Sequence, residues 1–171
     1  MRSTTLTVSI FAVAAAAAAC GGDVDLTGVY RVDRAVASMP CGEDQPVVNP
    51  PAFLKFTKGD FLGIPFFSYD ECTDAAATDC VSGGGGGYFE PFDDGWSGFV
   101  SSSSGFDGKC SLRIDDQKAT LRGDVIDIEA HVYSEEDVAL PSERCQPEEA
   151  EARGDTMPCV SHEQILATRV D

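Results

Sequence analysis

Apolar and polar residues alternate along much of the chain, and this alternation is the strongest structural signal in the sequence. Residues 125–132, VIDIEAHV, place the isoleucines on one face and Asp127, Glu129 and His131 on the other. The same pattern recurs at 26–33 and 110–115. A period of two is typical of a β-strand with one face in the core and one in water. We therefore expect strands over these three segments.

Shorter apolar stretches predict further strands, and turn signals separate them. The further strands are expected at 53–57, 61–69, 88–92, 96–101, 119–122 and 163–170. Turn signals lie at 58–60, 94–95, 107–108, 115–117 and 123–124. One short helix is expected at 147–153, where proline opens the segment, acids follow and Gly154 ends it. This arrangement predicts an all-β fold, an antiparallel meander that closes into a small barrel or stacks into a sandwich.

The start of the chain has the composition of an export signal. Arg2 gives it a positive charge, an apolar run follows, and three small residues precede Cys20. The sequence Ala17-Ala18-Ala19-Cys20 resembles the lipobox of bacterial lipoproteins, although that family usually has leucine where this chain has Ala17. The resemblance implies that a lipid is attached to Cys20 and that the preceding leader is removed. The protein would then be held in the cell envelope, at the outer membrane or a periplasm-facing leaflet.

This interpretation divides the chain into three parts. Residues 1–19 form the signal peptide, residues 20–25 the lipidated terminus and a short tether, and residues 26–171 a single β domain. An ordinary secretory signal, cut near Ala19, is the alternative, and it would leave Cys20 without a lipid.

The cysteine content indicates an oxidising compartment, because the chain has 7 cysteines and no CxxC pair. If Cys20 carries a lipid, the other cysteines can all form disulfides. Cys72 and Cys80 flank a short loop. Cys41 lies just after the first strand and Cys159 just before the last, and these two strands are neighbours in a closed barrel. We therefore expect the pairs Cys72–Cys80, Cys41–Cys159 and Cys110–Cys145. Other pairings stay open.

The order of the elements loosely resembles that of lipocalin-like β-barrels, with an opening LTGVYRV strand, a meander, a late helix and a final strand. Those barrels typically carry Gly-x-Trp in the first strand, where this chain has Gly28-Val29-Tyr30. The resemblance implies an interior that binds a small apolar ligand. The residues expected to line such a pocket are Trp96, Phe66, Phe92 and Phe99. A packed core is the alternative role for these aromatic side chains.

The net charge of −17, from 12 basic and 29 acidic residues, argues against nucleic-acid binding. Affinity for nucleic acid depends on lysine and arginine contacts to phosphates, and this surface repels them. The chain has no Gly-x-Ser-x-Gly elbow, no phosphate-binding loop and no EF-hand. Its paired acids fit turns better than a calcium site. We therefore expect no catalytic residue, no metal ligand and no cofactor.

These observations favour an exported, lipid-anchored envelope protein that binds a small ligand without catalysis. Two alternatives remain. A protein-interaction or inhibitor domain would present the disulfide-closed loop region 70–95 to a partner. An envelope hydrolase would require His131 or His162, the only histidines, to meet carboxylates in a concave site.

Overall fold

The computed structural model describes residues 24–82, 87–106 and 108–170. The expected signal peptide and Cys20 lie outside the described residues. The elements are β1 (Gly28–Ser38), β2 (Gln45–Pro46), β3 (Phe53–Phe61), β4 (Ile64–Cys72), β5 (Cys80–Ser82), β6 (Glu90–Phe92), β7 (Gly95–Phe106), β8 (Lys109–Arg122), β9 (Val125–Val138), α1 (Pro147–Arg153) and β10 (Cys159–Arg169). Short 3-10 helices, η1 (Ser142–Arg144) and η2 (Gly154–Thr156), flank α1.

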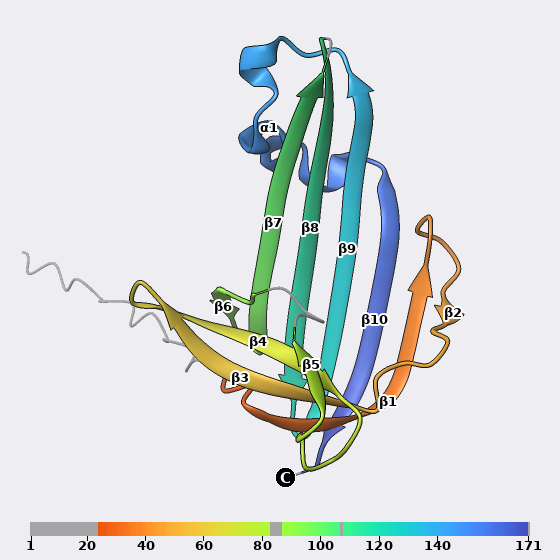
Figure 1. Cartoon of the computed structure of the whole chain (residues 1–171), viewed down its shortest axis with the longest axis vertical. Helices are drawn as coiled ribbons and strands as arrows, with labels where there is room; N and C mark the ends of the chain where they lie inside the picture. Colours follow the sequence, from red (N-terminus) through yellow and green to blue (C-terminus); the bar gives the residue numbers. More distant parts are fainter. Residues whose placement is uncertain (1–23, 83–86, 107, 171) are drawn as a thin grey trace, which may run out of the picture.

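All these strands belong to one antiparallel sheet, in the order β5-β4-β3-β1-β10-β9-β8-β7-β6, with β2 paired to β1. The long strands β7 to β10 run side by side, while β3 and β4 cross near their lower ends (Figure 1). The sheet is not closed into a barrel. An isolated bridge joins Phe67 of β4 to Tyr88, just before β6. The predicted antiparallel all-β fold is thus confirmed, whereas barrel closure is not observed.

The larger hydrophobic cluster lies where β1, β3 and β4 cover the lower ends of the long strands. Its largest buried side chains include Tyr30, Phe56, Phe67 and Trp96. Aromatic rings contact one another there, with the Tyr30 and Phe56 centroids 5.7 Å apart and those of Phe67 and Trp96 5.0 Å apart. Part of the aromatic content of the middle third is therefore core, namely Phe67, Tyr69, Tyr88 and Trp96.

A second cluster lies on the opposite face of the long strands, beneath α1. It contains Ile114 of β8 and Ala150 of α1. Ile114 pairs with Tyr133, whereas Ile128, in the first cluster, is five residues earlier on β9. Because side chains alternate along a strand, an odd separation places Tyr133 and Ile128 on opposite faces. Each face of the long strands is thus covered over only part of its length.

Two expected turns are wrong. Residues 58–60 belong to β3, and the hairpin turns at Leu62-Gly63, where both residues have positive φ angles, 54° and 84°. Asp60 accepts a hydrogen bond from the Gly63 N–H at 2.8 Å. It therefore stabilises the turn from within strand β3, although it is not one of the two turn residues. Residues 115–117 lie within the uninterrupted strand β8, which replaces two expected strands. The helix at 147–153 is confirmed.

The three disulfides connect the pairs expected from the sequence, Cys41–Cys159, Cys72–Cys80 and Cys110–Cys145. The first joins the loop after β1 to the start of β10, and the third joins β8 to the segment before α1. Among the described residues, no helix has the length and apolar character needed to span a membrane.

Candidate metal-binding site

Both histidines of the chain lie side by side on the face of the sheet that carries α1. His131 of β9 and His162 of β10 are direct partners in the antiparallel ladder. Glu129 is two residues before His131 on β9, so its side chain projects from the same face. The strands therefore bring two imidazoles and one carboxylate to a single point.

The donor atoms of these three residues lie within 4.8 Å of one another. Glu129 Oε1 is 3.7 Å from His162 Nε2 and 3.9 Å from His131 Nε2. The centroids of the two imidazole rings are 4.6 Å apart. A tetrahedral zinc ion, with bonds of about 2.1 Å, needs donors about 3.4 Å apart. The two carboxylate–imidazole distances exceed that spacing by only about 0.5 Å, so the residues fit a small metal ion.

Asp44 holds His162 from its other side. Its Oδ1 atom is 2.9 Å from His162 Nδ1 and also accepts a hydrogen bond from the Ser38 hydroxyl at 3.0 Å. Because a carboxylate only accepts, Nδ1 of His162 donates its proton to Asp44, which leaves Nε2 as the ring atom that faces Glu129 and could bind a metal. The hydrogen bond from His162 lowers the pKa of Asp44. Carboxylates commonly orient metal-binding histidines in this way.

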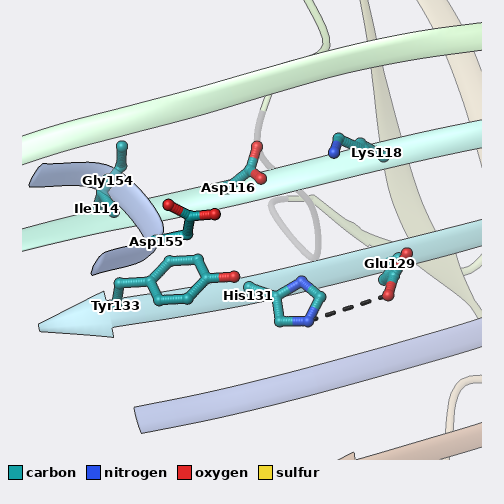
Figure 2. Close-up of a pocket in the computed structure, with 8 residues that line it drawn as sticks. All are labelled: Ile114, Asp116, Lys118, Glu129, His131, Tyr133, Gly154 and Asp155. Atoms are coloured by element: carbon teal, nitrogen blue, oxygen red, sulfur yellow. Dashed lines mark ion pairs between the residues drawn. The ribbon is translucent and has the colours of Figure 1, made fainter. Parts of the chain in front are cut away.

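A pocket of about 340 Å³ opens beside His131. Figure 2 shows His131 and Tyr133 next to each other on β9, Asp116 and Lys118 on β8, and Asp155 of η2 on the opposite wall. The Tyr133 and His131 rings are nearly parallel, with centroids 5.8 Å apart. The space therefore combines an aromatic wall with several charged groups, next to the open side of the histidine pair.

The aromatic residues expected to line an apolar pocket lie in different surroundings. Trp96 is only 1% exposed, packs in the larger cluster, and donates its indole N–H to the Val24 carbonyl at 2.7 Å. Phe66 stacks on Phe89, while Phe99 is 46% exposed and pairs with Asp116 on β7–β8. Phe92 is partly buried at the end of β6.

The expected interaction loop, 70–95, is partly incorporated into the fold. Its Cys72–Cys80 disulfide closes a segment in which Asp74 accepts a hydrogen bond from the Thr78 hydroxyl at 2.8 Å. Tyr88 is fully buried in the larger cluster. The described part of this region therefore offers less free surface than the sequence suggests.

Sequence analysis named His131 and His162 only as what a hydrolase would require, and it did not predict that they join Glu129 in a possible metal site. The alternation around residue 130 correctly placed Glu129 and His131 on one face. Nothing local, however, indicates that His162 becomes the partner of His131 or that Asp44 contacts it.

A scan against protein-family models and searches of curated proteins and of solved structures found no match to this chain.

Proposed function

We propose that this protein binds a divalent transition-metal ion through Glu129, His131 and His162. The observation that carries the proposal is the convergence of two imidazole Nε2 atoms on one carboxylate oxygen. Imidazole ligands suit zinc, copper and nickel, whereas calcium and magnesium prefer sites made only of oxygen atoms. Asp44 acts as the positioning residue for His162.

We also propose that the protein is an exported lipoprotein of the cell envelope, anchored to membrane lipid through Cys20. The disulfides support an oxidising location. They pair Cys41, Cys72, Cys80, Cys110, Cys145 and Cys159, so Cys20 is the one cysteine of the sequence outside these pairs. A lipidated Cys20 accounts for the odd number without a free thiol.

For the architecture, we favour an incomplete barrel over a sandwich. The strands form one continuous sheet, and the Phe67–Tyr88 bridge brings its two ends into contact at one point. Two separately packed sheets would not need that bridge.

Zinc titration by isothermal calorimetry of the metal-free protein tests the proposed site. We expect one equivalent to bind, and we expect His131→Ala, His162→Ala and Glu129→Gln each to weaken binding by about 100-fold or more, beyond the 10- to 100-fold typical of outer-shell changes. Glu148→Gln, which removes one charge from the exposed part of α1, is the matched control and should bind like the parent. Equal affinities in all variants would contradict the proposal.

Metal-assisted hydrolysis is a second candidate, favoured by the 340 Å³ pocket beside a site to which the described residues contribute three donors. Three-donor zinc sites keep a position for water and lower its pKa, which supplies a hydroxide nucleophile. Lys118 and Tyr133 would then contact the substrate in the pocket. Hydrolysis of p-nitrophenyl acetate by the zinc-loaded parent, lost in His162→Ala, would support this role. Equal rates for parent and variant would reject hydrolysis as a function, and the protein would then only bind the metal.

A further inference from the structure

The tip of the β3–β4 hairpin exposes large apolar side chains to solvent. Phe61, Leu62 and Ile64 are 61%, 87% and 53% exposed. Phe66 lies on the same face of the hairpin as Ile64 and stacks on Phe89, which is itself partly exposed, with ring centroids 5.2 Å apart. We call these five residues the apolar tip. Contiguous exposed apolar patches on soluble domains mark contacts with proteins or membranes.

The turn itself is unusual in its choice of residue. Leu62 and Gly63 form the two-residue connection, and Leu62 has a φ angle of 54°. Asparagine, aspartate or glycine normally occupies such a position, because a positive φ is unfavourable for other residues. The Leu62 side chain is 87% exposed, so no burial within the described protein offsets this strain.

Apart from Asp60, whose carboxylate accepts the Gly63 N–H in the turn, the tip carries no charge within a strongly acidic chain. Residues 61–69, FLGIPFFSY, contain no charged side chain, although the protein carries a net charge of −17. Lys58, three residues before the tip, is exposed and lies over the Phe67 ring at 5.6 Å. An anionic lipid surface would therefore repel this segment less than the rest of the protein.

The start of the described chain is held near the middle of the same hairpin. The Val24 carbonyl accepts the Trp96 indole N–H, and the Asp25 carboxylate interacts electrostatically with Lys58. Cys20 is four residues before Val24, a span of at most about 14 Å when fully extended. A lipid attached there would keep this part of the hairpin close to the membrane.

We propose that the apolar tip inserts into the membrane surface that holds the acylated Cys20. Phe61, Leu62 and Ile64 would reach the boundary between headgroups and acyl chains, where amphipathic segments bury their apolar side chains. The inference rests on the proposed lipid anchor. It adds a second attachment point, which would fix the orientation of the domain on the membrane.

Tryptophan fluorescence in vesicles tests this proposal. The full chain, processed and extracted from membranes, is reconstituted into phosphatidylcholine–phosphatidylglycerol vesicles as Leu62→Trp or Val48→Trp. Val48 is 84% exposed in the loop after β2 and serves as the matched control, while the buried Trp96 gives a constant background. We expect Leu62→Trp emission to shift to shorter wavelength and to fall by about half with brominated acyl chains at the interfacial depth. Val48→Trp should show neither change.

The outcomes separate the anchor from the tip. Protein that floats with the vesicles while Leu62→Trp stays unshifted and unquenched retains the anchor and overturns insertion. A blue shift without quenching by brominated lipid indicates contact with a second copy or another protein and also overturns it. Protein that does not float contradicts the anchor. Insertion rests on the anchor, so this outcome overturns it as well, and the flotation result distinguishes it from failure of the tip alone.

Discussion

At the scale of single residues, Asp44 illustrates how a side chain far away in sequence controls the candidate site. It lies 118 positions before His162, yet its carboxylate fixes the tautomer of that imidazole. The Cys41–Cys159 disulfide holds together the two segments that carry these residues. Asp44 therefore affects the metal site without being one of its three donors.

We expect Asp44→Asn to weaken zinc binding by about 10- to 100-fold, the range found for outer-shell partners of metal-binding histidines. The amide no longer fixes Nδ1 of His162 as the donor, so Nε2 loses its defined lone pair. Glu43→Gln removes the neighbouring exposed charge and is the control. Calorimetric affinities that are equal for the two variants would show that Asp44 contributes only its charge.

At the scale of elements, an ion-pair network attaches α1 to the sheet. Arg153 contacts Glu149 on its own helix and Glu135 on β9, while Arg144 pairs with Glu149 at 2.7 Å. The hydrogen bonds from Arg144 and Arg153 lower the pKa of Glu149 below its usual value of 4.5. The ionised form of Glu149 therefore stabilises the docked helix.

This network predicts a pH dependence of stability. Because the folded-state pKa of Glu149 is depressed, its contribution is present above pH 4.5 and is lost as the pH falls through the folded pKa. We expect Glu149→Gln to have a lower Tm than Glu148→Gln at pH 7, and the difference to close in strongly acidic solution. Thermal unfolding followed by circular dichroism at several pH values measures this. A difference that persists unchanged in acid would contradict the assignment.

The elements that were predictable are those whose signal is local. The helix at 147–153 was confirmed because its proline, acids and following glycine all lie within one short segment. The turn expected at 115–117 failed because Asp115 and Asp116 occupy the middle of a long strand, where Asp115 pairs with Arg113 at 2.6 Å. Acidic residues on an uncovered strand surface look like a turn when only the sequence is read.

At the scale of the whole molecule, the hydrophobic interior changes from one face of the long strands to the other. Alternation alone predicted buried residues at both ends of β8. It did not predict that Ala119 belongs to the larger cluster and Leu112 to the second cluster, beneath α1. The position of His162 opposite His131 likewise depends on the register of β10, which shifts between Cys159 and Ser161. Register and covering elements are long-range properties, and therefore the site could not be read from local pattern.

The disulfides should differ in their contributions to stability. Cys41–Cys159 spans 118 residues and Cys72–Cys80 spans 8. In the chain-entropy model the longer loop restricts the unfolded chain more, so we expect the Cys41→Ser, Cys159→Ser double variant to lose about 2 kcal/mol more than Cys72→Ser, Cys80→Ser. Urea unfolding of both double variants gives the comparison. Equal losses would mean that strain or residual structure outweighs loop length.

Anomalous diffraction from a crystal grown with zinc tests the central claim most directly. We predict one anomalous peak, about 2.1 Å from Nε2 of His131, Nε2 of His162 and a carboxylate oxygen of Glu129. The peak should be absent from crystals of His162→Ala prepared in the same way. An ordered histidine pair without a zinc peak, or zinc bound only at other positions, would contradict the account.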